Sequence, residues 1–389
     1  MEHLSEILKI LDGALKANAS MASNYAGLLA DKLELDGSSR QARMIRERLA
    51  RAPAALASAQ DASGGVNFGS LPVDGESHLH TVDVSYPVIG DDPLLLPSAI
   101  QQRVDEFLVN VRRYDDLAKA GAAMPSRLLT YGLPGTGKTK LARAVAADLG
   151  MPLLTVRCDT LVSSLLGQTS RNLRRVFEYS QQRPCVLFLD EFDALAGARG
   201  NERDVGELQR VVISLLQNID SLSDNTILVA ATNHDQLLDP AIWRRFGFRI
   251  PMPKPDARLR KLLWNQFLYP LKPEGIDLTD LVIASDGITG ANIEQVCLDA
   301  KRTAVLANAS EIDEIQLYRR LGLALALTGS VMLSTIEAEI QWLRHWDSKR
   351  FSLRNLAKIY GLSLRSVTNI LKEETNSGRE ETAGTGGTA

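Results

Sequence analysis

The chain has 389 residues, of which 45% are hydrophobic, so it is long enough to form two or three domains with large cores. Its formal net charge of −3 excludes a globally basic surface for nucleic acid or an anionic membrane, so any basic surface has to be local. It has no apolar run of eighteen residues and does not begin with a basic segment followed by an apolar one, which predicts a cytoplasmic protein without a membrane segment.

The first fifty residues show helical spacing of apolar side chains. Leucine and isoleucine recur every three or four positions from Leu4 to Leu15, and a second pattern runs from Leu28 to Leu33. We therefore predict a small helical module over residues 1–50, whose apolar faces need a partner or a neighbouring subunit to cover them. Residues 51–84 shift to Ala, Ser, Gly and Pro, which predicts a flexible linker.

Strand-like and helix-like segments alternate over residues 85–255. Short apolar runs predict strands at residues 127–131, 153–156, 185–189 and 226–231. Helical spacing fills the intervals, at residues 94–114, 138–149, 170–180 and 208–222. This alternation predicts a doubly wound α/β domain with a parallel sheet, which binds its ligand at the carboxyl ends of the strands.

A glycine-rich segment, GLPGTGKT at residues 132–139, joins the first of these strands to the helix that follows. It fits the phosphate-binding pattern, in which glycines let backbone N–H groups converge on phosphate oxygens, the lysine reaches the β- and γ-phosphates, and the last hydroxyl ligates Mg²⁺. The sequence therefore predicts a site for ATP and Mg²⁺. The residues predicted to bind the nucleotide here are Gly132, Pro134, Gly135, Thr136, Gly137, Lys138, Thr139 and Lys140.

Two adjacent acids, Asp190 and Glu191, follow the strand at residues 185–189. Asp190 is the predicted second ligand of Mg²⁺ beside Thr139, and Glu191 is the predicted general base that polarises the attacking water. Asn233 ends the next strand along the chain, where it is placed to orient the same water or to sense the γ-phosphate. All three fall at the edge of the sheet where we expect the ligand.

After Pro255 the pattern becomes helical, which predicts a helical lid domain over residues 256–346. Cys185 and Cys297 lie inside apolar patterns, so we expect reduced, buried thiols. The last residues, 375–389, are rich in Thr, Gly and Glu, and we expect a disordered tail.

These segments resemble the AAA family of ATPases in their order and spacing. The resemblance covers roughly residues 85–310 and is carried by residues 132–139, 187–193, 231–233, 238–246 and 287–293. It implies a homo-hexameric ring with ATP at each subunit interface, where Arg244 and Arg245 match the arginines that reach the γ-phosphate of the neighbouring subunit. Gly290 and Ala291 match the glycine-alanine pair that begins a lid-domain helix at the nucleotide.

The loop after the second predicted strand departs from the family's pattern. Substrate-threading members carry an aromatic residue before a hydrophobic-glycine pair there, whereas this chain has Leu165 before Leu166 and Gly167. An aliphatic side chain still grips a peptide sterically, but it weakens the case for strong translocation. The resemblance is to bacterial single-ring proteins, some of them encoded beside a subtilisin-like protease, which suggests such a protease as a partner.

A second signal lies near the C-terminus, where residues 353–372 resemble a helix-turn-helix. Ala357, Gly361, Val367 and Ile370 fit its packing and turn positions, and residues 349–372 contain six lysines or arginines and no acid. The outward positions of its second helix would then be Arg365, Ser366, Thr368 and Asn369. The segment, which we take as residues 347–374, is predicted either to bind duplex DNA or to dock a protein. Two functions follow: a ring ATPase that remodels a protein, or an ATP-switched oligomer that binds DNA.

Overall fold

The computed structural model describes residues 3–15, 19–50, 82–156, 158, 168–196, 205–224 and 226–372. The chain forms two compact units, residues 1–253 and residues 254–389. Within the described ranges, no helix is both long enough and apolar enough to cross a membrane. The predictions for Leu165, Leu166 and Gly167, for linker residues 51–81 and for the tail at residues 375–389 lie outside those ranges.

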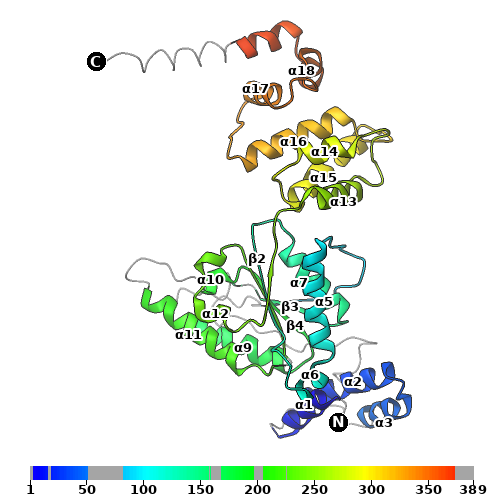
Figure 1. Cartoon of the computed structure of the whole chain (residues 1–389), viewed down its shortest axis with the longest axis vertical. Helices are drawn as coiled ribbons and strands as arrows, with labels where there is room; N and C mark the ends of the chain where they lie inside the picture. Colours follow the sequence, from blue (N-terminus) through cyan, green and yellow to red (C-terminus); the bar gives the residue numbers. More distant parts are fainter. Residues whose placement is uncertain are drawn as a thin grey trace. The chain divides into compact units, whose positions relative to one another are not determined.

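A six-stranded sheet lies at the centre of the first unit (Figure 1). Its strands are β1 (Val82–Ser85), β2 (Arg127–Tyr131), β3 (Leu153–Val156), β4 (Val186–Leu189), β5 (Ile227–Thr232) and β6 (Phe248–Pro251). Their order across the sheet is β1-β3-β4-β5-β2-β6. β1 is antiparallel to β3, and the other neighbours are parallel. The predicted α/β fold is therefore confirmed, and β2, which leads into the phosphate loop, lies inside the sheet.

Helices cover both faces of the sheet (Figure 1). On one face, α5 (Ser98–Arg112) and α7 (Lys138–Asp148) pack against Leu128 and Phe188 of the strands. On the other, α9 (Gln168–Gln181) and α11 (Val205–Ser221) pack against Leu129 and Leu187. Because both faces are covered, every residue of β4 is buried, which explains its continuous apolar sequence. Three shorter helices are α6 (Tyr114–Lys119), α10 (Asp193–Ala196) and α12 (Pro240–Trp243).

The N-terminal helices of the first unit are α1 (Leu4–Leu15), α2 (Ala19–Leu35) and α3 (Ser39–Ala50). The leucines of α1 do not face its neighbour, since Leu8 and Leu15 are 52% and 76% exposed while Glu6 and Gly13 are buried. Gly13 lets the two helices approach, because a Cβ there would lie 2.6 Å from the backbone nitrogen of Ala22. Lys32 then pairs with the buried carboxylate of Glu6 at 2.5 Å. The predicted helices are present, and the apolar stripe of α1 is exposed.

The described part of the second unit is helical. Its helices are α13 (Ala257–Leu268), α14 (Leu278–Ala284), α15 (Gly290–Leu306), α16 (Glu314–Thr328), α17 (Ile336–Trp346) and α18 (Leu353–Tyr360), and residues 364–372 are also helical. Arg350 connects several of them. Its guanidinium pairs with Asp280 at 2.8 Å and with Asp347 at 3.0 Å, and it lies 3.8 Å from the ring centroid of Tyr318.

The elements that the sequence pattern does not predict include β1, β6 and α14, besides the short helices α6, α10 and α12. β1 begins at Val82, inside the predicted linker, and its alternating burial depends on pairing with β3. In β6, Ile250 is the buried residue, so no continuous apolar run marks the strand. By contrast, all three cysteines are buried and outside any disulfide, as predicted for Cys185 and Cys297.

Candidate functional site

The phosphate loop connects β2 to α7 at the carboxyl edge of the parallel strands. Gly132 and Gly137 have φ values of +143° and +100°, which favour glycine. A Cβ on Gly132 would also lie 2.3 Å from the carbonyl oxygen of Met252. Gly137 is the N-cap residue of α7, so the unpaired N–H groups of the helix start adjoin the loop. The loop therefore offers backbone donors to an anion.

Lys138 lies folded over this loop. Its Nζ donates hydrogen bonds to the carbonyl oxygens of Gly132 and Leu133, each at 2.8 Å. Burial lowers the pKa of the Lys138 ammonium, and the carboxylates of Asp190 and Asp193 oppose that shift. The cation is thus held at the loop by backbone oxygens and attracted by two acids from the end of β4.

Thr139 and Asp190, the two predicted metal ligands, are in contact. The Thr139 hydroxyl donates to Asp190 Oδ2 at 2.9 Å, which joins the start of α7 to the end of β4. A hydroxyl and a carboxylate are oxygen ligands of the kind that Mg²⁺ takes, with water and phosphate oxygens completing its shell. The residues present therefore fit a Mg²⁺-nucleotide. Lys140, also predicted to bind nucleotide, forms an ion pair with Asp92 at 3.0 Å.

Glu191 adopts an uncommon backbone conformation, with φ at +51°. The left-handed region costs a residue other than glycine about 1–2 kcal/mol. Two hydrogen bonds hold the turn: the Glu191 N–H donates to Asp190 Oδ1 at 3.0 Å, and the Ala194 N–H donates to the Glu191 carbonyl at 2.9 Å. The Glu191 carboxylate is exposed and forms no hydrogen bond or ion pair with any described residue. It is therefore free to contact a water molecule.

Asn233 directly follows β5 and is half-buried. Its N–H donates to Asp193 Oδ1 at 3.4 Å, and the hydroxyl of Thr232 donates to the same oxygen at 2.7 Å. A backbone hydrogen bond from Phe192 to Ala231, at 2.9 Å, also joins the ends of β4 and β5. Asp193 is a site residue that the sequence pattern did not single out, although an acid three residues beyond Asp190 is visible in it.

The geometry agrees with a family match. Residues 128–254 match the family described as "ATPase family associated with various cellular activities (AAA)". This chain contains an AAA ATPase domain. The matched range includes the phosphate loop, Asp190, Glu191, Asn233 and both predicted arginines.

Proteins of other organisms are similar to part of this chain. An AAA family ATPase of Sinorhizobium fredii, named as uncharacterized, is 40% identical over 214 residues, which cover 54% of this chain and 63% of the relative. Proteasome-activating nucleotidase 1 of Haloferax volcanii is 33% identical over 241 residues, covering 60% and 58%. The ATP-dependent zinc metalloprotease FtsH of Rhodococcus erythropolis is 36% identical over 223 residues, covering 55% and 26%. The chain thus spans less than two thirds of the length of each.

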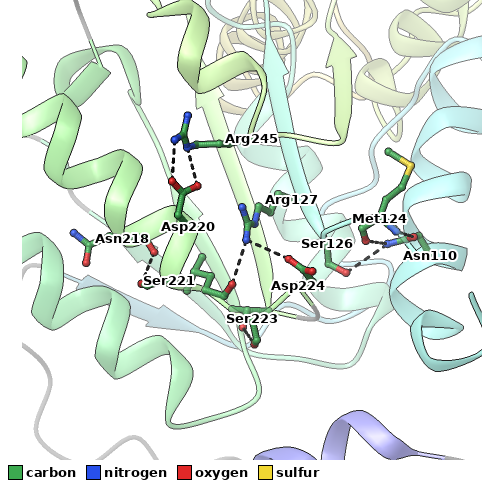
Figure 2. A network of polar contacts seen from close by, with 12 residues as sticks. Asn110, Met124, Ser126, Arg127, Asn218, Asp220, Ser221, Ser223, Asp224 and Arg245 are labelled. Atoms are coloured by element: carbon green, nitrogen blue, oxygen red, sulfur yellow. Dashed lines mark hydrogen bonds and ion pairs between the residues drawn. The ribbon is translucent and has the colours of Figure 1, made fainter. Parts of the chain in front are cut away.

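Arg244 and Arg245 occupy different surroundings in the AAA domain. Arg245 forms two hydrogen bonds of 2.8 Å with the carboxylate of Asp220, at the end of α11. Figure 2 shows this pair near the contact of Arg127 with Asp224, at the amino ends of β2 and β5. The phosphate loop is at the opposite, carboxyl edge of these strands. The Arg244 side chain is exposed and forms no hydrogen bond or ion pair with the described residues.

Gly290 and Ala291 belong to the second unit, at the start of α15. Thr289 is the N-cap residue there, and its hydroxyl accepts from the Asn292 N–H. This local geometry is that of an ordinary capped helix start. A contact of either residue with the nucleotide stays a prediction.

The C-terminal helices of the second unit form a compact group. Gly361, with φ at +65°, ends α18, and the helix at residues 364–372 follows. Leu356 and Val367 are fully buried, and the Gln341 side chain of α17 donates to the Ile370 carbonyl at 3.0 Å. The exposed side chains of this group include Arg354, Lys358, Arg365, Asn369 and Lys372, whereas Ser366 and Thr368 are half-buried. Of the six predicted basic residues, Arg350 is occupied by the ion pairs described above.

Proposed function

We propose that this chain hydrolyses ATP as a subunit of a homo-hexameric ring and uses the reaction to remodel a protein or a protein complex. The AAA domain supports the hydrolysis, because its phosphate loop, Thr139–Asp190 contact and strand-end acids are placed together at one edge of the sheet. The ring and the substrate rest on the family resemblance. Since the chain spans only part of its relatives, its activity as a whole is our inference.

Each site residue has a distinct role in this proposal. The phosphate loop and Lys138 bind the β- and γ-phosphates, and the Thr139 hydroxyl and Asp190 carboxylate would hold Mg²⁺. The bound ion would neutralise charge that develops on the phosphate oxygens. Glu191 accepts the proton of the attacking water, and Asn233 orients that water.

The observation that carries the assignment of Glu191 is its strained backbone. Non-glycine residues in sparsely populated φ/ψ regions cluster at active sites, where surrounding contacts maintain them. Glu191 has φ at +51°, and it directly follows the residue that contacts Thr139. Its carboxylate is exposed to solvent and has no protein partner among the described residues, so it is available to accept a proton from water.

The two arginines are not equal candidates for action on a neighbouring subunit. The hydrogen bonds of Arg245 with Asp220 also raise its guanidinium pKa, which marks a favourable ion pair that a trans role would have to break. Arg244 has no such contact to lose. We therefore propose Arg244 as the residue that reaches the γ-phosphate of the next subunit, with Arg245 fixing the backbone beside it.

The proposed protein substrate has two sources of support. Relatives are named as a proteasome-activating nucleotidase and as FtsH metalloproteases, names that describe those proteins. The family resemblance adds a subtilisin-like protease as a partner and Leu165 to Gly167 as a pore loop. Copurification of the chain with candidate proteases in the presence of ATP tests the partner.

The test of hydrolysis is the substitution Glu191→Gln, which keeps the size of the side chain and removes the base. We expect ATP turnover to fall by roughly 100-fold or more, because general bases contribute about 10²–10⁴-fold. Affinity for ATP should change little, since binding depends on the loop, Lys138 and Mg²⁺. Lys138→Ala should instead abolish binding. A Glu191→Gln protein that turns over ATP at the parent rate contradicts the assignment.

A second candidate function, binding of duplex DNA, is favoured by the C-terminal helices. Among the described residues, Arg354, Lys358, Arg365 and Lys372 form no ion pair, and residues 349–372 contain no acid. In a ring of six subunits, the weak DNA contacts of the single subunits would combine into tighter binding. ATP binding would then switch the assembly on DNA, and hydrolysis would reset it.

Binding to labelled duplex DNA across a salt series separates the two candidates. If these two helices contact DNA, loss of Lys358 or Lys372 should lower the slope of log K against log salt by about one unit each. Replacement of Arg365 or Asn369 should weaken the free energy of DNA binding by about 1–3 kcal/mol and relax the preference for one base position. If the full chain with ATP shows no salt-sensitive binding at low ionic strength, the segment is better explained as a protein-docking surface.

A further inference from the structure

Thr232 lies where three segments of the AAA domain meet. It is the last residue of β5, it is fully buried, and its carbonyl oxygen accepts a hydrogen bond from the Gly132 N–H at 3.3 Å. Its hydroxyl donates to Asp193 Oδ1 at 2.7 Å and accepts from the His234 N–H at 3.0 Å. One residue therefore connects the phosphate loop, the segment after β4 and the turn after β5.

These hydrogen bonds enclose Asn233 on both sides. The Asn233 N–H donates to Asp193 Oδ1, and the next N–H, that of His234, donates to the Thr232 hydroxyl. The backbone that carries the Asn233 side chain is thus fixed relative to Asp193, which lies three residues after Asp190. We propose that Asp193 and Thr232 are positioning residues, which hold Asn233 in the place where it orients the attacking water. This inference rests on the proposed ATPase function.

The charge of Asp193 supports a role at the nucleotide. Asp193 lies close enough to the phosphate-loop lysine for its carboxylate to stabilise the Lys138 ammonium, together with Asp190. Its own Oδ1 receives two donors, so a neutral acceptor of the same shape would keep part of the arrangement. A hydrogen bond network of this kind fixes geometry more strictly than its single bonds do.

A purely structural reading is the alternative. Asp193 is the first residue of the short helix α10, where an acid is favourable, and a buried hydroxyl needs a partner in any protein. Both readings predict that removal of the Thr232 hydroxyl is harmful. They differ in whether the harm depends on the side chain of Asn233.

The experiment compares Thr232→Val and Thr232→Ser in the full chain, with Thr130→Val as the matched control. Thr130 is fully buried in the neighbouring strand β2, and no hydrogen bond partner of its hydroxyl occurs among the described residues. Thr232→Val should lower kcat for ATP roughly tenfold or more, because a displaced Asn233 side chain loses its hydrogen bond to the attacking water. KM should change by less than about twofold, because that hydrogen bond contributes to the reacting complex and not to the binding of ATP. Thr232→Ser should retain most of the turnover, and Thr130→Val should turn over like the parent.

The decisive comparison repeats the Thr232→Val substitution in a protein that already carries Asn233→Ala. If Thr232 acts through Asn233, Thr232→Val should slow the Asn233→Ala protein by less than about twofold, since no amide remains to be misplaced. Asp193→Ala should behave in the same way, and Asp193→Asn should lie between it and the parent. If Thr232→Val lowers kcat equally in the parent and in the Asn233→Ala protein, the positioning role is refuted and the proposed ATPase function is not. A parent chain without ATP turnover refutes the proposed function and this inference together.

Discussion

The substitution Gly132→Ala tests whether the backbone of the phosphate loop is as tightly constrained as its geometry indicates. The new Cβ would lie 2.3 Å from the Met252 carbonyl oxygen and 3.1 Å from its carbonyl carbon, so one of the two backbones has to move. Overpacking costs about 1–3 kcal/mol, and the φ of +143°, which lies outside the left-handed helical region, adds about 1–3 kcal/mol for alanine. We therefore expect a loss of about 2–6 kcal/mol in the free energy of unfolding.

Gly150→Ala is the matched control for this change. Gly150 has φ at +63°, and a Cβ there would meet nothing within 4 Å, so only the backbone cost of about 1–2 kcal/mol applies. Both glycines belong to the first unit. The difference between the two variants contains the clash at Met252, about 1–3 kcal/mol, together with the difference in backbone cost between a φ of +143° and one of +63°.

Thermal denaturation without nucleotide and anisotropy of a fluorescent ATP analogue give the two readouts. Gly132→Ala should bind the analogue at least about tenfold more weakly, because the carbonyl that accepts from Lys138 and the N–H that donates to Thr232 both belong to Gly132. Gly150→Ala should bind within about twofold of the parent. A Gly132→Ala protein with parental affinity and the stability of the control refutes the reasoning.

Three further predictions follow from packing and burial. Gly322→Ala should lower the stability of the second unit by about 1–3 kcal/mol, because its Cβ would lie 2.7 Å from Leu343 and 2.8 Å from Trp346. Gly27→Ala in α2, where a Cβ meets nothing within 4 Å, should instead raise stability by about 0.5–1 kcal/mol in urea unfolding; equal effects contradict the packing account. Arg350→Ala should destabilise the second unit by about 1–3 kcal/mol in the same urea assay. Arg350→Lys should recover less than half of that stability, because lysine lacks the planar group that stacks on Tyr318. Full recovery by lysine would exclude a contribution from stacking. Burial raises the pKa values of Cys185 and Cys297 to about 12, so at pH 8 only about one thiol in ten thousand is ionised, and maleimide labelling of both should require denaturant; rapid labelling of the native chain contradicts their burial.

The sequence predicted the parts of the site that depend on local pattern. The strand at residues 127–131, the loop after it and the acids after Leu189 follow from apolar runs and glycine spacing, and the structure brings Thr139 and Asp190 into contact. Their meeting was predictable because the carboxyl ends of parallel strands share one edge. The positive φ of Glu191 was not predictable, since it is held by a hydrogen bond from its N–H to Asp190 and by one from the Ala194 N–H to its carbonyl.

Contacts between distant segments account for the rest. Periodicity marks the leucines of α1 correctly, but it does not show that a close approach at Gly13 turns the opposite face inward. The surroundings of Arg245 were hidden for a similar reason, because its partner Asp220 comes from a helix 25 residues earlier. The Asp193–Thr232 contact likewise spans two strand ends that only the sheet order makes neighbours.

In our proposal, this AAA domain hydrolyses ATP at a site completed by the next subunit. Mixing Arg244→Ala protein with Glu191→Gln protein tests it most directly, because each variant alone should be nearly inactive while mixed rings contain intact sites. At equal amounts with free exchange, about a quarter of the interfaces combine a parental Arg244 with a parental Glu191, and we expect about a quarter of the parent turnover. If the mixture shows only the summed activity of the two variants, while both still assemble and exchange, the shared site is contradicted.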